Sequence, residues 1–363
     1  MTYSLLPINR SIGFWRAGPL EGNVKVLRTV TGDVPIHEVG HLQPHEHVLS
    51  DIGNTQQQQG TALASCEEIR LDTYYEVRRH HSRFDMEVVD VETAVAELDS
   101  YREAGGSAIV DATSVDLGRD PSGLVEVASR TELHIVMGAG YYHRDYHPNE
   151  LERRSRQDIA QEIHDDVAIG VGQDGIRAGL IGEIGLGWPV HPVEANVLSA
   201  AVDAQRTTGA ALMIHPGRHP EAPMDAMNRV GTAGGDPGRV IMSHIDRTLF
   251  DLSSMLQLAR TGCYLEFDLF GQESSYYPYA DIDMPNDATR IDYLVALQTH
   301  GFGDSLLVSQ DICFKTHLER YGGEGYAHIL RHVLPLMRRK GLDDDFVTQL
   351  THVNPRTALE VNA

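Results

Sequence analysis

The chain has 363 residues, of which 41% are hydrophobic, and this suits one large α/β domain or two ordinary ones. Thirty basic against fifty-two acidic side chains give a net charge of −22, which argues against nucleic acids and anionic membrane surfaces as partners. No signal peptide is predicted, because Pro7 and Arg10 interrupt the first apolar residues, and no run reaches membrane-spanning length. Cys66, Cys263 and Cys313 form no CxxC pair, which indicates free thiols in a reducing compartment and predicts a cytoplasmic protein.

Strand-like and helix-like segments alternate through most of the chain. A β-hairpin is predicted first, around Thr31 and Gly32. Helical patterns then separate short apolar runs that are typical of buried strands, and these runs lie at residues 41–49, 106–113, 133–140, 176–185, 210–217, 239–246, 263–270 and 305–312. Eight repeats of strand and helix predict a closed parallel (β/α)₈ TIM barrel, with a doubly wound open sheet as the alternative.

Two connections are longer than the rest. Residues 51–90 follow the first barrel strand and residues 269–290 follow the seventh, so both are expected over the same mouth of the barrel. The tail, residues 352–363, predicts a short capping helix. Nothing resembles a linker between domains, so we expect a single domain over residues 1–363, of which residues 1–41 form an N-terminal extension and hairpin.

The first barrel strand carries two histidines in the stretch LQPHEHVLS. In a strand, residues two apart point to the same face, so His45 and His47 would both point into the barrel, with Glu46 facing away. In a chain with 19 histidines, one HxH pair is weak evidence by itself. The weight of the argument therefore lies with the other strands.

Four more strands end in a possible metal ligand. The active sites of TIM barrels lie at the carboxyl ends of the strands, where these side chains would meet His45 and His47. Imidazole and carboxylate groups are the ligands that Zn²⁺ and Mn²⁺ prefer. The alternative is that each residue is only a polar cap at its strand end. The four residues are Glu183, His215, His244 and Asp311.

The motifs that surround these residues carry a family resemblance. HEH, VDATSVDLGRDP, GAGYY, GIRAGLIGEIG, MIHPGR, SHIDR and SQDI with a later NP occur in order between residues 45 and 355. In this respect the chain resembles the phosphotriesterase-related branch of the amidohydrolase superfamily. The resemblance covers nearly the whole chain.

The resemblance implies two divalent metal ions, expected to be Zn²⁺, with Mn²⁺ or another transition metal as the alternative. His45 and His47 would bind one ion together with Asp311, and His215 and His244 would bind the other. In the founding phosphotriesterases a carboxylated lysine bridges the two ions. This chain has no lysine between residues 25 and 315, so it is similar to the members whose bridge is a glutamate, here Glu183.

Such a site predicts a hydrolase. Two cations lower the pKa of a bridging water, and the hydroxide that forms can attack a carbonyl or phosphoryl centre. Asp311 is expected to be the catalytic acid and base as well as a ligand. We expect hydrolysis of a small ester, lactone or amide, with phosphotriesters as at most a side activity. The alternative is a barrel that binds a small molecule without turnover, with metals that only hold its shape.

Further residues are expected near the metals and the substrate. Asp246 and Asp111 are candidate partners that would orient the ligand histidines. A second group of residues follows the strand ends and is predicted to contact a small substrate. The positively charged members of this group would bind an anionic group of the substrate. The residues are Tyr141, Tyr142, Trp188, Arg218, Arg247 and Lys315. Rim salt bridges are the alternative role for the cations. By family analogy, a homodimer is one expected assembly.

One competing motif is HEVGH at residues 37–41, which matches the HExxH pattern of zinc proteases. That pattern requires a helix, because only there do its two histidines share a face. Pro35, Gly40 and Pro44 surround the segment here, which favours an extended chain and argues against a protease.

Overall fold

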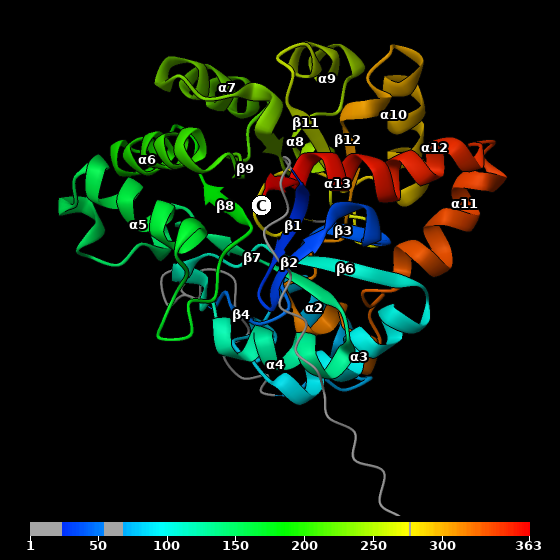
Figure 1. The fold of residues 1–363 in the computed structure, drawn as a ribbon. Coiled ribbons are helices and arrows are strands. Elements are labelled where there is room, and N and C mark those ends of the chain that lie inside the picture. Colours follow the sequence, from blue (N-terminus) through cyan, green and yellow to red (C-terminus); the bar gives the residue numbers. More distant parts are fainter. Residues whose placement is uncertain (1–23, 54–67, 276) are drawn as a thin grey trace, which may run out of the picture.

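The computed structural model describes residues 24–53, 68–275 and 277–363. Its centre is an eight-stranded sheet in which every strand runs parallel to its neighbours (Figure 1). This is the predicted TIM-like barrel, and its strands are β3 (His41–Glu46), β6 (Gly106–Asp111), β7 (His134–Ala139), β8 (Leu180–Gly185), β9 (Ala211–His215), β10 (Val240–Met242), β11 (Tyr264–Phe267) and β12 (Leu306–Val308).

The strands follow one another around the barrel in chain order, from β3 to β12. The first and last strands meet through backbone bonds just beyond the ladder. The amide of His47 donates to the carbonyl of Ile312 at 3.0 Å, and the amide of Asp311 donates to the carbonyl of His45 at 3.2 Å. These bonds nearly close the barrel at the end where the predicted ligands lie.

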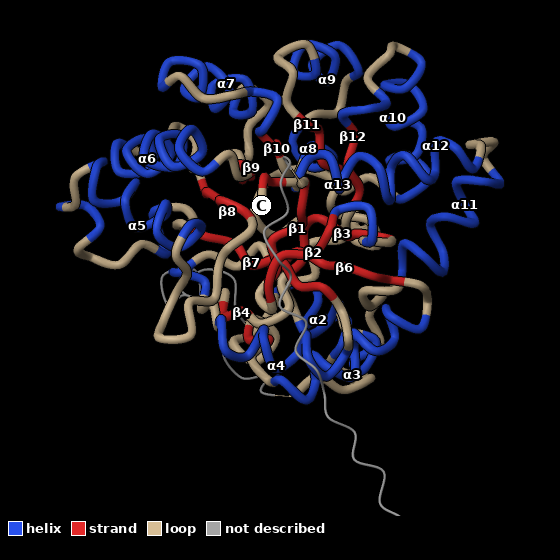
Figure 2. Tube along the Cα trace, in the orientation of Figure 1, coloured by secondary structure: helices blue, strands red, loops and turns tan. Residues whose placement is uncertain are grey.

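Helices cover the outside of the barrel (Figure 2). Polar caps begin many of them, as where the Asp90 carboxylate accepts from the Thr93 amide and the Asn286 side chain accepts from the Thr289 amide. The α-helices are α2 (Tyr74–His80), α3 (Val91–Glu103), α4 (Pro121–Thr131), α5 (Arg156–Ala168), α6 (Pro192–Thr208), α7 (Ala222–Ala233), α8 (Ile245–Thr248), α9 (Leu252–Ala259), α10 (Asp287–Thr299), α11 (Leu334–Arg339), α12 (Asp344–Thr348) and α13 (Asn354–Leu359).

A small antiparallel sheet lies against one end of the barrel (Figure 1). The predicted hairpin forms it from β1 (Lys25–Thr29) and β2 (Gly32–Pro35). The tail forms the expected helix, α13, and then continues into β13 (Val361–Asn362), which pairs with β1. Leu27 of β1 packs with Leu42 and other inward-facing residues into a separate apolar cluster, so the hairpin seals the barrel interior at this end.

The two long loops meet at the opposite end. The loop after β3 contains α2 and a short ladder of β4 (Ser50–Asp51) with β5 (Glu87–Val88). The ring of His81 in this loop lies parallel to the ring of Tyr279 in the loop after β11, with centroids 6.0 Å apart. Residues 54–67 and 276 of these loops lie outside the described residues. Among the described residues, no helix combines the length and the apolar character that crossing a bilayer requires.

Candidate metal centre

The six predicted ligands come together at the carboxyl end of the barrel. His45 lies in β3 and His47 directly after it, and their side chains are 0% and 2% exposed. Glu183 lies within β8, while His215 ends β9. The remaining two, His244 and Asp311, follow β10 and β12 and have φ angles of 56° and 50°. The backbone of a residue other than glycine is strained in this left-handed region, and such strain is common at functional sites.

Glu183 lies between the two pairs of histidines. Its Oε1 atom is 3.6 Å from Nε2 of His47, and its Oε2 atom is 3.1 Å from Nδ1 of His215 and 3.4 Å from Nε2 of His244. Glu183 therefore belongs to two groups that could each hold a cation, one with His45 and His47 and one with His215 and His244. It bridges the two pairs, as the sequence predicted for the residue that replaces a carboxylated lysine.

In three of the histidines, a buried acceptor fixes the far ring nitrogen, by which we mean the nitrogen that points away from Glu183. Nδ1 of His45 lies 3.0 Å from Glu266 and 3.1 Å from Asp268, and Nδ1 of His244 lies 2.9 Å from Asp268. Nδ1 of His47 lies 2.9 Å from Oγ1 of Thr113. A neutral imidazole that donates from Nδ1 keeps its lone pair on Nε2, so all three present that lone pair toward Glu183.

These residues fit a pair of divalent cations. Nε2 of His45 is buried and has no hydrogen-bond partner, although a buried polar atom normally has one. Burial lowers the pKa of His45, but Glu266 and Asp268 outweigh burial and raise it well above its ordinary value. Burial also lowers the pKa of His244, and Asp268 more than compensates, raising it to about 9. The negative charge around these rings thus stabilises positive charge in a buried site. A metal cation can provide this positive charge as well as a proton can.

Asp311 is the most accessible of the six, with 16% of its side chain exposed. Its Oδ1 atom lies 3.3 Å from Nε2 of His47 and 3.8 Å from Nε2 of His45. The side-chain amide of Gln272 donates to the Asp311 carbonyl at 3.2 Å, which supports its strained backbone. Asp311 therefore borders both the histidine pair of β3 and the open side of the site.

Comparison with known proteins gives this arrangement a family. The sequence model of the Phosphotriesterase family matches residues 25–359. The chain belongs to this family. It is accordingly a hydrolase within the amidohydrolase superfamily, and its site has the bridging glutamate in place of a lysine.

Several known proteins are similar to the chain along nearly their whole length. A phosphotriesterase-related protein from Nematostella vectensis is 35% identical over 344 residues, which cover 92% of this chain and 98% of the relative. An N-acetyltaurine hydrolase from Dictyostelium discoideum is 33% identical over 361 residues, with coverage of 92% and 98%. The crystal structure of a resiniferatoxin-binding protein from Rhodobacter sphaeroides superposes with a TM-score of 0.86 at 33% identity, covering 92% of this chain and 94% of that one.

The partners of the histidines differ from those predicted. Among the described residues, Asp246 makes no hydrogen bond to a histidine; its Oδ2 atom accepts from Nε of the buried Arg290 at 2.6 Å. The role expected of Asp246 falls to Asp268 and Glu266, which sequence reasoning missed. Asp111 acts one step away from His47, because the hydroxyl of Thr113 donates to Oδ1 of Asp111 at 2.9 Å while facing the His47 ring.

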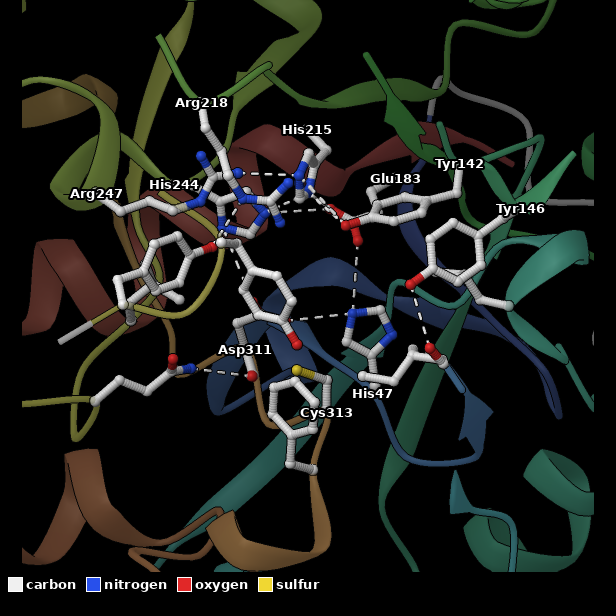
Figure 3. A pocket seen from close by; sticks show the side chains of 17 residues that line it. His47, Tyr142, Tyr146, Glu183, His215, Arg218, His244, Arg247, Asp311 and Cys313 are labelled. Carbon is white, nitrogen blue, oxygen red and sulfur yellow. Dashed lines mark hydrogen bonds and ion pairs between the residues drawn. The ribbon is translucent and has the colours of Figure 1, made fainter. Parts of the chain in front are cut away.

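A pocket of about 590 Å³, open solvent at its mouth included, lies above the histidines. Figure 3 shows Arg218 and Arg247 on one side of this metal pocket, Tyr142 and Tyr146 on the other, and Glu183 between them. Of the residues predicted to contact substrate, Tyr142, Arg218 and Arg247 line the pocket.

The other three predicted contacts are not among the residues that line the metal pocket. The hydroxyl of Tyr141 donates to Glu162 of α5 at 2.7 Å, which turns this side chain outward from the barrel. Trp188 stacks on His219, with ring centroids 4.6 Å apart, and is 37% exposed. Nζ of Lys315 donates to the carbonyl of Phe84 at 2.6 Å. We therefore do not carry these three into the proposed site.

The two pocket arginines are held by neutral groups. Nη2 of Arg247 lies 3.0 Å from Nε2 of His215 and 3.4 Å from the Pro216 carbonyl. Nε of Arg218 donates to the Tyr277 hydroxyl at 3.0 Å, and its guanidinium lies 5.1 Å from the centre of the Tyr279 ring. Neither has a carboxylate among these contacts, so both keep charge to offer an anion in the pocket.

Proposed function

We propose that the chain hydrolyses the amide bond of a small N-acylated amine that carries an anionic group, with N-acetyltaurine as the first substrate to test. The observation that carries the proposal is the presence of Arg218 and Arg247 on the pocket wall of a chain whose net charge is −22. A relative that is 33% identical is an N-acetyltaurine hydrolase, which favours an amide over an ester or a lactone.

The pocket offers a place for each part of such a substrate. The anionic group would lie at Arg218 and Arg247, where guanidinium groups bind sulfonate or carboxylate oxygens with charge-assisted hydrogen bonds. The scissile carbonyl would then lie above Glu183. A short acyl group would face the apolar cluster of Leu117, Tyr142 and Tyr146, against which Ile52 packs. The bulky side chains of this cluster favour acetyl over longer acyl groups.

In this proposal the cations are held by His45, His47, Glu183, His215, His244 and Asp311. When bound, two divalent ions activate water as a nucleophile and polarise the carbonyl. Asp311 accepts a proton from the attacking water at a carboxylate oxygen and returns it to the leaving nitrogen. A C–O bond forms, the amide C–N bond breaks, and the products are a carboxylate and an amine. The exposure and position of Asp311 support this role.

Kinetics on matched substrates test the proposal. We expect metal-loaded protein to hydrolyse N-acetyltaurine with a higher kcat/KM than its neutral analogue N-acetylethanolamine, an aryl ester or a lactone. The substitution Arg218→Ala should lower kcat/KM for N-acetyltaurine about 10- to 100-fold, the value of one or two charge-assisted hydrogen bonds, and change the neutral amide far less. Arg130→Ala, on the surface of α4, is the matched control.

Two results would contradict the proposal. An equal loss for the anionic and the neutral amide would remove the role of Arg218 in binding the anion. Binding of N-acetyltaurine without turnover, at an affinity that Asp311→Asn leaves unchanged, would instead favour a barrel that binds small molecules.

A further inference from the structure

A second hollow lies beside the metal pocket. This outer basin has about 1000 Å³ of space, including open solvent, and the loops after β3 and β11 supply most of its lining. Four side chains line both hollows, and we refer to them as the partition: Gln272, Tyr277, Tyr279 and Phe314. The two hollows are therefore separated by a wall only one side chain thick.

Tyr279 is the central member of the partition. The guanidinium of Arg218, which lines only the metal pocket, lies 5.1 Å from the centre of its ring. The ring of His81, which lines only the outer basin, lies parallel to it at 6.0 Å. His81 in turn stacks on Phe314 at 3.8 Å, and its Nδ1 atom is fixed by Asp85 at 2.8 Å. Tyr279 thus stands between the proposed anion site and the basin.

The lining of the outer basin favours an apolar or aromatic ligand group over a second anion. Tyr75, Pro278, Met284 and Phe314 provide apolar and aromatic surface. Two arginines line the basin. Nη2 of Arg78 donates to Glu324 at 2.6 Å, and Arg79, which donates to the Tyr75 hydroxyl at 3.3 Å, shares the basin with the acidic Glu273, so the charges there offset one another. A group that entered the basin would gain contact with aromatic faces and little electrostatic stabilisation.

We propose that the outer basin is a second substrate compartment, and that Tyr279 closes it and thereby limits the amine half of the substrate to a narrow, unbranched group. This inference rests on the proposed function, which places the anionic group at Arg218. In an N-acyl α-amino acid, the side chain branches from the same carbon that carries the carboxylate. With the carboxylate at Arg218, that side chain meets the Tyr279 ring, and removal of the ring opens a path into the basin.

The test compares N-acetyl-L-phenylalanine with N-acetylglycine, which share the acetyl group and the carboxylate and differ only in the side chain. We expect the ratio of their kcat/KM values to be well below one in the parent protein. Tyr279→Ala should raise the ratio at least tenfold. Tyr279→Phe keeps the ring and should keep the parent ratio. A second substitution that refills the basin, Ser275→Trp in the Tyr279→Ala protein, should return the ratio toward that of the parent.

Tyr293→Ala is the matched control for loss of a tyrosine, because Tyr293 lies on α10 and lines neither hollow. Its ratio should equal that of the parent, with thermal unfolding measured for every variant. Calorimetric affinities for the same two ligands, measured on metal-loaded protein, separate the two proposals. Absence of turnover with an affinity ratio that follows Tyr279 and Ser275 would overturn the amidase and retain the compartment. Ratios that stay constant across the series, or binding of neither ligand to Tyr279→Ala, would overturn the compartment.

Discussion

The two histidine pairs around Glu183 differ in what lies behind them. Behind the inner pair, His45 and His47, both Nδ1 atoms face fully buried acceptors. Behind the outer pair, His215 and His244, only His244 has such an acceptor. The far nitrogen of His215 faces the guanidinium of Arg247 instead, and burial holds its pKa well below the ordinary value, assisted by positive charge at His244 and Arg247.

If the two pairs bind two cations as proposed, the barrel framework would hold one of them, and the other would lie beside the pocket wall that carries Arg247. Hydrogen bonds to the far ring nitrogen fix the orientation of a ligand histidine and raise its basicity. In the inner pair, both rings have such hydrogen bonds, and the acceptors are buried on the side away from the open pocket. The outer pair has Arg247, which also lines that pocket. We therefore expect the inner cation to be retained longer than the outer one.

The largest effect on metal content and activity is expected at Glu183, which lies between the two histidine pairs. Glu183→Gln removes the negative charge that both pairs share, and we expect the metal content to fall from two equivalents to one or none. Activity should fall by more than the roughly 10- to 100-fold that is typical of losing a partner of a ligand. Elemental analysis of purified protein and kcat/KM are the measurements.

Glu162→Gln on α5 is the control for this substitution, because it removes a carboxylate that accepts from Tyr141 outside the pocket. It should retain two equivalents. Full metal content in Glu183→Gln would show that the two pairs do not depend on a common bridge.

A smaller effect on metal affinity is expected at Asp268, and comparison with the nearby buried Asp246 distinguishes metal binding from stability of the fold. Asp268 faces one histidine of each pair, so Asp268→Asn should weaken metal affinity about 10- to 100-fold with a small change in stability. Asp246→Asn breaks the buried ion pair with Arg290 and should lower the free energy of unfolding by about 3 kcal/mol. Metal titration and denaturant unfolding of both variants give the comparison. Equal losses of affinity in both would assign Asp246 the role that we give to Asp268.

The smallest effects should distinguish the inner from the outer cation. We expect a chelator to remove the two cations in separate phases, the outer one first. Thr113→Val, which removes the hydroxyl between His47 and Asp111, should speed the slow phase only. Tyr142→Phe, which removes the hydroxyl 3.1 Å from His215, should speed the fast phase only. Changes of a few-fold are expected, because each lost hydrogen bond is neutral and contributes about 1 kcal/mol. A single phase, or the opposite assignment, would contradict this order.

Much of the site could be predicted because barrel geometry converts sequence position into spatial position. The carboxyl ends of the strands converge, so residues as distant in sequence as His45 and Asp311 were expected to meet, and the structure places them 3.8 Å apart. The resemblance to phosphotriesterase-related proteins, together with the absence of a lysine between residues 25 and 315, implied Glu183 as the bridge. These inferences depend on strand ends and on the period of two, which are the most regular features of the fold.

The residues that were missed or misplaced depend on details beyond this regularity. Glu266 lies in β11 and Asp268 directly after it, just as His45 lies in β3 and His47 directly after it, so the same period of two could have found them. For Tyr141, Trp188 and Lys315, proximity to a strand end was correct, but the direction of the side chain was set by partners elsewhere, such as Glu162 for Tyr141. Sequence alone gives no access to those partners.

The backbone bonds that join the ends of β3 and β12 have a consequence for folding. They form a seam between the earliest and the latest strand of the barrel, and His45, His47 and Asp311 all lie on it. A cation bound by His45, His47 and Asp311, as proposed, would therefore gain these ligands only after the chain has been synthesised through residue 311 and the barrel has closed. Uptake of such an ion would follow barrel closure, and the bound ion would stabilise the closed barrel against opening between β3 and β12.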